Sequence, residues 1–508
     1  MSSLKAVWLW FGIGKSGLNF SGSYLNKMNK LFVKTPEKYW AYLALFVWGG
    51  LVFMLLHKAS YGVDEGAAQA LLLVWSVVDN VASPVVALGF PDFRAIFLAP
   101  VGFLWTGNVL AAKIATIIVM AAAAWAFNAW KKSKGDSEGG LLATGLLLIS
   151  PLVLDQIDTI SVAPFLLLTF VLGAWLEKMY GETPLAFGGM YFAQLFLCMV
   201  SITLHPIGLA YPLALLWSWY KSSLHERQRS YFIVGITFAV LLTLALTSGW
   251  AHVGWFENPV ASLSSVLLGA TDADEISVLR WVVGVWAVLV LLVVLWKQAG
   301  ELWADFLGRI FLIALVIGVL TSDAIFAMVA LVICLYWGLP LLLYKPESRE
   351  SGFWGQRGMV LLLILVVSTV FMVVDKGRYQ QVMSGDLSPR DSIIRALAED
   401  SGNFLNETPG QDVHDKKTIR VASQWPGLTM LACRCDALPL PPTAKDGEAL
   451  LAMLRGVNYL IFDPRNPVNS SLSHNLANMG AGKVETAVLQ RGGVIVEIKS
   501  SLPNKAGE

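Results

Sequence analysis

The chain has 508 residues, of which 56% are hydrophobic and 14% are charged, and its mean hydropathy is +0.61. Soluble domains carry about 25% charged residues, so this composition excludes a soluble enzyme over most of the length and indicates an integral membrane protein. The net charge of +1 gives no support for nucleic-acid binding.

A basic segment begins the chain. Residues 1–38 contain six lysines and one acidic residue, Glu37. The apolar run that follows, 39–56, lacks the small-residue cleavage site of a secretory signal, so we expect a retained span preceded by a cytoplasmic segment. The stretch LKAVWLWFGIGK within this segment either lies flat on the membrane surface or belongs to a disordered tail.

Long apolar runs then follow one another as far as residue 375. A helix needs about 20 apolar residues to cross a bilayer. On this criterion the sequence predicts a mostly α fold, a polytopic bundle over 39–375 with about eleven spans: 39–57, 108–130, 139–154, 159–176, 186–204, 206–220, 231–249, 280–296, 309–322, 324–344 and 358–375. Residues 94–106 are apolar but too short, and we expect an interfacial or re-entrant helix there.

The distribution of cations supports this topology. With the N-terminus inside, the inner segments hold 18 Lys and Arg residues, whereas the outer segments before residue 376 hold only Lys58, Arg94 and Arg280. Lys and Arg collect in cytoplasmic loops, so the two longest outer loops are 58–107 and 250–279. The same topology places eleven carboxylates outside, although acids follow no such rule.

The composition changes after residue 375. Residues 376–508 are mixed and polar, with proline and glycine turns and no apolar run long enough to span. The segment GEALLAMLRG has the pattern of an amphipathic helix ended by Gly456. Three segments have the pattern of strands: KTIRVASQ, VNYLIFD and GGVIVEIKS. We therefore predict a small extracytoplasmic α/β domain. Its Cys433 and Cys435 form either a local disulfide or two free thiols, because their spacing suits neither a zinc knuckle nor a redox pair.

Asp64 and Glu65 lie next to each other just after the first span. They are either acids that favour the N-terminal dipole of a helix beginning at this point, or a general base poised at the membrane surface. In the second case the acid removes a proton from an acceptor hydroxyl while the lipid part of a substrate remains in the bilayer.

Asp155 and Asp158 have i, i+3 spacing between two apolar runs, so on a helical turn they share one face. A carboxylate at the bilayer centre costs roughly 2.5–3.5 kcal/mol, which places the pair at an outer helix end or facing a wet cavity. Their oxygens could bind a divalent cation; a helix cap and a polar turn is the equal alternative.

Lys113 and His205 are the candidate phosphate ligands. Lys113 is a lone cation within a span; it either snorkels to the interface or meets a phosphate or carboxylate, and the outer acids are natural partners. His205 precedes Pro206 at an outer turn, where it could hold a phosphate or relay a proton, or fill a hydrogen bond at the break that the proline creates.

The sequence contains no P-loop, no G-x-G-x-x-G after a strand, no G-x-S-x-G and no H-E-x-x-H. Chemistry driven by ATP or NAD within this chain is therefore not expected.

In this order, these features resemble the GT-C superfamily of membrane glycosyltransferases, and within it protein O-mannosyltransferases and the bacterial aminoarabinose and lipopolysaccharide sugar transferases. The resemblance rests on the acidic pair in VDEG, on the proline-entered apolar helix in GFPDFRAIFLAPVGFLWTG, and on Lys113 early in the second span, where the family usually has arginine. LLLISPLVLDQIDTISVAPFLLLTFVLGAWL, LHPIGLAYPLALL and GVNYLIFD resemble later parts of the family. The resemblance to the superfamily covers residues 39–220 fairly well and residues 370–500 loosely.

The resemblance implies inverting transfer of a sugar from a polyprenyl-phosphate donor to a lipid, glycan or protein acceptor. The resemblance also implies that the reaction takes place at the outer face of a bacterial inner membrane, with the C-terminal domain in the periplasm. Asp64, supported by Glu65, would activate the acceptor hydroxyl, and Lys113 and His205 would hold the leaving phosphate. Asp155 or Asp158 would position the acceptor or a cation. No cofactor is implied, with a divalent cation as the alternative.

Other functions remain open at this stage. Gly66-Ala67-Ala68 follows the acidic pair where the family has a tyrosine, which is compatible with a non-catalytic scaffold subunit of a cell-envelope polysaccharide assembly. A lipid or solute transporter would also place acids and a histidine at outer cavities. An O-antigen ligase or polymerase is favoured if His205 rather than Asp64 proves essential.

Overall fold

The computed structural model describes residues 37–57, 62–79, 94–105, 107–135, 137–182, 187–221, 233, 235–237, 239–240, 278–321, 324–340, 356–384, 388–400, 419–433, 435–441, 444–464, 466, 469–479, 484–488 and 494–498. The chain divides into two compact units, residues 1–51 and 52–508, and helix α3 (Glu37–Leu55) belongs partly to each. The basic segment up to residue 36 lies outside the described residues, as do residues 250–277 of the predicted outer loop 250–279.

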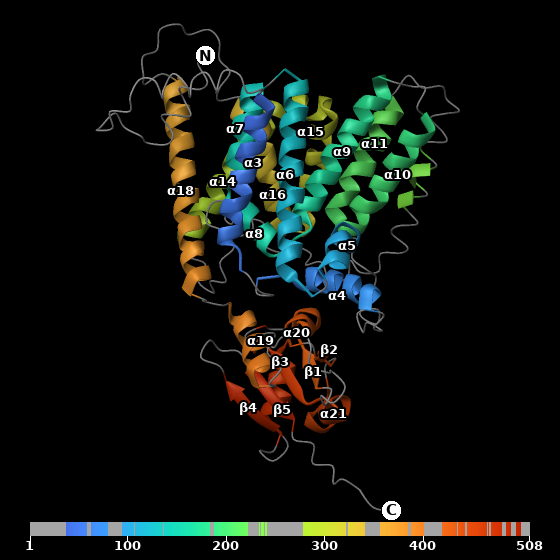
Figure 1. Ribbon diagram of the computed structural model, residues 1–508, viewed down its shortest axis with the longest axis vertical. Helices are drawn as coiled ribbons and strands as arrows, with labels where there is room; N and C mark the ends of the chain where they lie inside the picture. Colours follow the sequence, from blue (N-terminus) through green and yellow to red (C-terminus); the bar gives the residue numbers. More distant parts are fainter. Residues whose placement is uncertain are drawn as a thin grey trace, which may run out of the picture. The chain divides into compact units, whose positions relative to one another are not determined.

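Apolar helices make up most of the second unit (Figure 1). α6 packs against α7 and α9, and α15 packs against α11, α14 and α16. The helices are α6 (Val109–Ser133), α7 (Ser137–Leu148), α9 (Ala163–Glu182), α10 (Phe187–Leu204), α11 (Ala210–Lys221), α14 (Val278–Ala304), α15 (Phe306–Thr321), α16 (Ala324–Ile333) and α18 (Gln356–Ser384).

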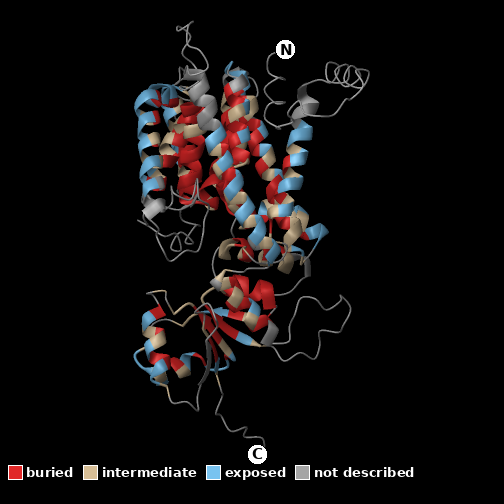
Figure 2. Cartoon of the chain, turned by 90° about the vertical axis from the view of Figure 1, so that its left-hand side faces the viewer, coloured by how far each residue is buried: buried red, intermediate tan, exposed pale blue. Residues whose placement is uncertain are grey.

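The outward faces of these helices are apolar although they are exposed (Figure 2). On α14 the side chains of Trp286, Leu292 and Trp296 are exposed, the last of them by 86%. Apolar surface of this extent on a long helix is stable in lipid and not in water. The chain is therefore a membrane protein, as the composition indicates.

The predicted number of about eleven spans is not confirmed. Within the described ranges, two helices are long and apolar enough to cross a membrane, Val109–Ser133 and Gly284–Ala304. A third is obtained if Gly139–Leu148 and Pro151–Asp158, which meet at a bend of 54°, count as one broken span. Several apolar runs do not form one long helix, because breaks and short turns interrupt them.

These breaks produce several short elements. α8 (Pro151–Asp158) follows the bend, and η3 (Pro206–Leu209) follows the His205-Pro206 break. η5 (Cys334–Gly338) is a π-helical turn at the end of α16. Two further helices are short, α4 (Glu65–Asp79) and α5 (Arg94–Leu104). α5 has 11 residues, so the prediction of a non-spanning helix in this region agrees with its length.

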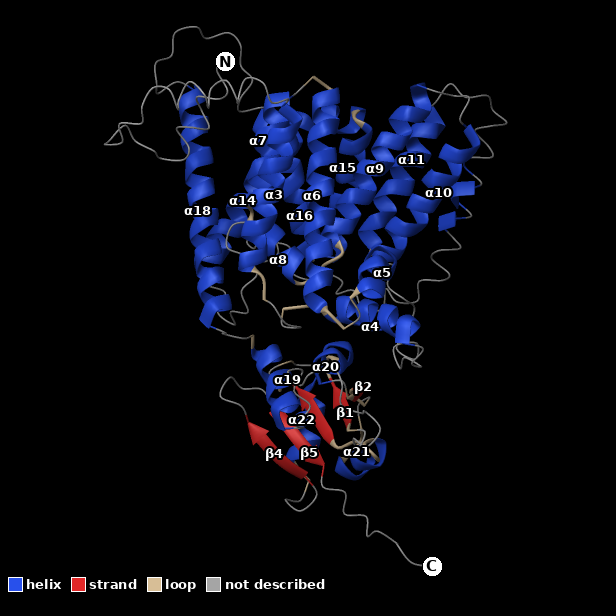
Figure 3. Cartoon of the chain, viewed as in Figure 1, coloured by secondary structure: helices blue, strands red, loops and turns tan. Residues whose placement is uncertain are grey.

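The C-terminal part contains a five-stranded mixed sheet (Figure 3). The strand order is β2-β1-β3-β5-β4, with β1 parallel to β2 and β3, and with β5 antiparallel to β3 and β4. The strands are β1 (Arg420–Ser423), β2 (Asp436–Pro439), β3 (Tyr459–Phe462), β4 (Val484–Val488) and β5 (Val494–Ile498). The three predicted strands correspond to β1, β3 and β5, whereas β2 and β4 were not predicted.

Four helices accompany this sheet: α19 (Pro389–Asp400), α20 (Pro426–Cys433), α21 (Gly447–Met453) and α22 (Ser470–Ala477). The core is built from Leu450, Leu460, Phe462 and Val496 with their buried neighbours. α21 lies in the predicted helical segment, and Gly456, which follows it, has a φ of +82°, a conformation that favours glycine. Cys433 and Cys435 are joined as a disulfide.

Candidate active site

α8 presents two carboxylates at one end of the helix bundle. Pro151 occupies the first turn of this helix, where its missing N–H is not needed. The bend before it directs the eight-residue helix away from the line of α7. Asp155 and Asp158 lie one turn apart on α8, as the i, i+3 spacing predicts.

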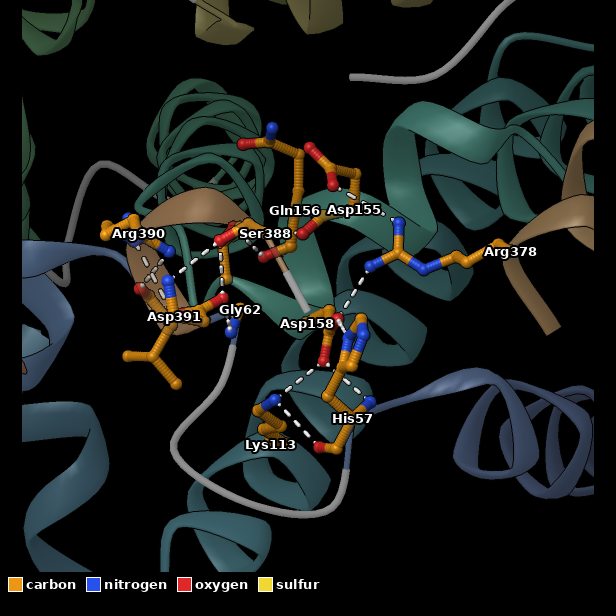
Figure 4. Close-up of polar contacts among 12 residues, drawn as sticks. His57, Gly62, Lys113, Asp155, Gln156, Asp158, Arg378, Ser388, Arg390 and Asp391 are labelled. Atoms are coloured by element: carbon orange, nitrogen blue, oxygen red, sulfur yellow. Dashed lines mark hydrogen bonds and ion pairs between the residues drawn. The ribbon is translucent and has the colours of Figure 1, made fainter. Parts of the chain in front are cut away.

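Asp158 is the centre of a buried polar cluster (Figure 4). Its Oδ1 accepts hydrogen bonds from Lys113 Nζ at 2.6 Å and from the His57 backbone N–H at 3.1 Å. Its Oδ2 accepts from Arg378 Nη2 at 2.7 Å and lies 2.5 Å from His57 Nδ1. Because a carboxylate only accepts, Nδ1 carries the hydrogen. With Asp158 1% exposed and Lys113 0% exposed, the two charges depend on each other for their burial.

Arg378 of α18 links the two carboxylates of α8. Its Nη2 binds Asp158 and its Nη1 donates to Asp155 Oδ1 at 3.2 Å. The two carboxylates, the guanidinium and the Lys113 ammonium sum to zero charge when His57 is neutral. The ammonium also donates to the His57 carbonyl at 2.8 Å. The cluster thus joins the end of α3, α6, α8 and α18 through charge-assisted hydrogen bonds.

Asp64 lies directly before α4 and is held from two sides. It accepts from the Ala67 N–H, which caps α4, and from Arg94 Nη1, which is 3.1 Å from Oδ1 and 2.9 Å from Oδ2. The same Nη1 donates to the Ile160 carbonyl at 2.9 Å. Ile160 has a φ of +54°, a rare conformation for a β-branched residue. The Asp64 side chain keeps 38% exposure, whereas Arg94 is buried.

Glu65 is bound differently from its neighbour. Its Oε1 accepts from the Gly427 N–H at 2.5 Å and its Oε2 from the Leu428 N–H at 3.0 Å, while Gln69 donates to Oε1 at 3.1 Å. Burial raises the pKa of the Glu65 carboxyl above its ordinary value, although these hydrogen bonds act in the opposite direction. Both oxygens of Glu65 are therefore engaged with α20.

Gly62 brings the chain before Asp64 against the cluster. A Cβ at this position would lie 3.0 Å from Asp158 Oδ2, and the φ of +79° also favours glycine. The Gly62 N–H donates to Asp391 Oδ2 at 3.1 Å, and Arg390 Nη2 donates to the Val63 carbonyl at 3.2 Å (Figure 4). The first turn of α19 therefore also contacts this part of the chain.

No family model matches the chain, and no curated protein sequence matches it. Solved structures do. The archaeal oligosaccharyltransferase AglB from Archaeoglobus fulgidus, in complex with an inhibitory peptide and a dolichol-phosphate, is similar over 92% of this chain and 75% of its own, with a TM-score of 0.52 and 11% identity. ArnT from Cupriavidus metallidurans, bound to undecaprenyl phosphate, is similar over 92% of this chain and 99% of its own, with a TM-score of 0.49 and 13% identity.

The chain shares the fold of AglB. The likeness to AglB confirms the fold that the sequence resemblance implies. At this identity it fixes the arrangement of the helices and not the chemistry of the side chains. The roles of the candidate site residues are therefore argued from their own contacts.

The fold brings Lys113, Asp155 and Asp158 together. Lys113 meets a carboxylate, which is one of the alternatives that the sequence left open, and its ammonium is directed to Asp158 and the His57 carbonyl. Five other residues of the cluster and its surroundings were not identified as site residues from the sequence: His57, Arg94, Arg378, Arg390 and Asp391.

His205 belongs to a different part of the bundle. Its Nδ1 accepts from the Ile207 N–H at 3.2 Å and so caps η3. η3 packs mainly against α10, α11 and α15. These contacts match the alternative interpretation of His205, a hydrogen bond at a proline break, and they do not link it with Asp64 or Asp158.

Two cationic side chains, those of Arg378 and Lys113, bind the carboxylates of the candidate cation site. Asp155 and Asp158 bind Arg378 and Lys113 rather than facing each other across an empty space. Over the described ranges, no group of three or more His, Cys, Asp or Glu residues is placed to hold a metal ion.

Proposed function

We propose that the chain is a membrane glycosyltransferase that moves a sugar from a polyprenyl-phosphate donor to an acceptor hydroxyl at the outer face of a bacterial inner membrane, with its C-terminal domain in the periplasm. The GT-C fold shared with AglB, whose structure holds a dolichol-phosphate, supports a lipid-phosphate donor. The lack of nucleotide-binding motifs in the sequence agrees with such a donor.

The accessibility of Asp64 is the observation that carries the proposal. Asp158 and Asp391 are buried by ion pairs and backbone donors, and Glu65 has both oxygens engaged. Asp64 is held in place by Arg94 and still keeps 38% exposure. A general base needs both a fixed orientation and access to the proton that it removes, and Asp64 combines the two.

In the proposed reaction, a carboxylate oxygen of Asp64 takes the proton of the acceptor hydroxyl. The hydroxyl oxygen attacks the anomeric carbon of the sugar as the bond from that carbon to the phosphate oxygen breaks. The bonding electrons leave with the polyprenyl phosphate, and the configuration at the anomeric carbon inverts. A single displacement needs one base and a stabilised leaving group, and not two catalytic carboxylates.

Cations near Asp64 would stabilise the leaving phosphate. Lys113 is fully buried and bonded to Asp158, so in this arrangement it supports the site through the cluster. Arg378 and Arg390 retain 18% and 28% exposure of their side chains. We therefore propose these two guanidiniums as the phosphate ligands, because the predicted ligand Lys113 is engaged with Asp158 and the predicted ligand His205 caps η3.

A transfer assay tests the proposal. The purified protein is reconstituted with radiolabelled polyprenyl-phosphate sugars and crude membrane acceptors, and wild type is compared with Asp64→Asn. The control is Asp446→Asn, because Asp446 also caps a helix by accepting from a backbone N–H, but it precedes α21 and is not part of the cluster. Asparagine is an equally good capping residue, so both variants keep their caps.

We expect transfer by wild type and Asp446→Asn and loss of transfer by Asp64→Asn with unchanged folding. Equal transfer by all three proteins would refute Asp64 as the base. Donor that crosses the bilayer without bond formation would indicate a transporter, and neither reaction nor transport would indicate a scaffold.

A further inference from the structure

The C-terminal part of the chain binds Asp64's neighbours on both sides. Before Asp64, α19 holds Gly62 through Asp391 and Val63 through Arg390. After it, α20 holds Glu65. Residues 62, 63 and 65 are therefore all bound by the C-terminal domain, while the carboxylate between them keeps access to its surroundings.

The contact between Glu65 and α20 is geometrically specific. Gly427 and Leu428 lie in the first turn of α20, whose N–H groups have no acceptor within the helix. Glu65 supplies one oxygen to each of them, at 2.5 and 3.0 Å. A Cβ on Gly427 would lie 2.7 Å from Oε1 and 2.9 Å from Gln69 Cγ. The helix therefore approaches Glu65 this closely only because glycine occupies position 427.

An apolar contact extends the interface between α4 and α20, two turns beyond Glu65 on α4 and one turn beyond Gly427 on α20. Leu72 of α4 packs against the cluster formed by Met430 and Ala437. Polar and apolar contacts thus join α4 to the α20–β2 region over two helical turns. Asp64 caps the N-terminus of this same α4, so a shift of α4 moves its carboxylate.

We propose that Glu65 is a positioning residue: its carboxylate clamps α20 of the C-terminal domain to α4, and this clamp, with Asp391 at Gly62, fixes the carboxylate of Asp64 in the site. The kinetic consequence rests on the proposed transferase function, whereas the clamp itself can be observed without it. Glu65 acts through Asp64 and does not share its proton transfer, because both of its oxygens accept hydrogen bonds from α20.

Hydrogen exchange in the full-length protein in lipid nanodiscs tests the clamp. Wild type is compared with Glu65→Gln, whose amide offers one acceptor oxygen in place of two, and with Gly427→Ala, which displaces α20 from the other side. The matched control is Glu448→Gln, an exposed acid in the first turn of α21. Loss of one charge-assisted hydrogen bond should speed exchange on the order of tenfold or more in the peptides that contain 427–428 and 62–68, with no change in the control.

The transfer assay tests the positioning role. A small displacement of a catalytic group can lower the rate by about 100-fold, so we expect Glu65→Gln and Gly427→Ala to lower kcat by this order. The KM for the lipid donor should change by less than about threefold, since the binding of the donor is not altered. Glu448→Gln should keep the wild-type kcat.

Two outcomes overturn the proposal. Unchanged exchange in both clamp variants would mean that Glu65 does not hold the domain; a fall in kcat of Glu65→Gln alone would then assign it a direct chemical role. Faster exchange with unchanged kcat would mean that the clamp does not position Asp64. Failure of wild type to transfer any sugar would contradict the proposed function instead, and the exchange measurement would still decide on the clamp.

Discussion

Removal of the Asp158 carboxylate tests how the buried cluster contributes to stability. In Asp158→Asn the side chain keeps its shape and still has an oxygen for the His57 N–H, but the charge opposite Lys113 disappears. The Lys113 ammonium, 2.6 Å away and fully buried, then has no carboxylate within the pair. Breaking a buried ion pair by removing one partner costs about 3–5 kcal/mol. Arg378 loses less, because it keeps Asp155.

The double variant Asp158→Asn/Lys113→Met distinguishes this cause from a loss of packing. Methionine has nearly the length of lysine and carries no charge, so the uncompensated cation is removed. Coupling energies between residues in contact reach about 3 kcal/mol, and we expect the second substitution to recover about 2 kcal/mol of the loss.

The free energy of unfolding is measured by titration of the protein in mixed micelles with sodium dodecyl sulfate, followed by circular dichroism. Asp446→Asn, at an exposed helix cap, serves as the control and should stay within about 0.5 kcal/mol of wild type. A loss below about 1 kcal/mol for Asp158→Asn, outside the range for a broken buried pair, would refute the argument. A double variant no more stable than the single variant would refute it as well.

Three further predictions concern the region around Asp64. Asp64→Asn should lower kcat by about 10²–10⁴-fold, the range for loss of a general base. Its free energy of unfolding should fall by about 1–2 kcal/mol, less than for Asp158→Asn, because Asp64 is 38% exposed and an asparagine oxygen still accepts from Arg94. A kcat of the folded variant within about tenfold of wild type, below the range for a general base, would contradict this. Gly427→Ala should destabilise the protein by about 1–3 kcal/mol, because its Cβ would meet Glu65 Oε1. The control Gly300→Ala, within α14 and with open space at its Cβ, should stabilise the protein by about 0.5–1 kcal/mol. Unfolding titrations in which Gly427→Ala is the more stable of the two variants would exclude the steric explanation. Burial raises the pKa of Glu65, so the folded protein binds the proton of this carboxyl more tightly than the unfolded chain does. The free energy of unfolding of wild type relative to Glu65→Gln should therefore rise as the pH falls from neutral toward 4.5, and level off below it. If this free-energy difference grows with rising pH instead, the pKa of Glu65 is lowered and not raised by folding.

Periodicity and composition were sufficient to predict the class of fold and most helices. Runs such as 109–133 are long and uniformly apolar, and a bilayer admits few structures other than helices. The breaks were harder to place, because Pro151 and Pro206 interrupt runs whose hydropathy is continuous. In the C-terminal domain, β2 has the sequence DALP, which ends in proline and lacks the β-branched residues typical of strands. Its pairing with β1 supplies the stability that its own residues do not.

Only the part of the candidate site that depends on local sequence spacing was predicted. Asp155 and Asp158 are related by local helical geometry, which the spacing reveals. Arg378 and Asp391 are more than 200 residues away from Asp158 along the chain, and no local pattern indicates that α18 and α19 bring them to α8 and Gly62. His57 carried no signal as a partner, because its link to Asp158 uses a backbone N–H as well as the ring.

The burial of Lys113 against Asp158 also constrains how this protein enters the membrane. The two residues lie on α6 and α8, with α7 between them in the chain. An unpaired charge on a spanning helix costs up to about 2.5–3.5 kcal/mol, the value at the bilayer centre, so α6 is less suited to lipid before α8 supplies Asp158. We expect the three helices to be released from the insertion machinery together. A chain that lacks one partner of the pair should then accumulate in the membrane to a lower level than wild type, because part of it is degraded during insertion.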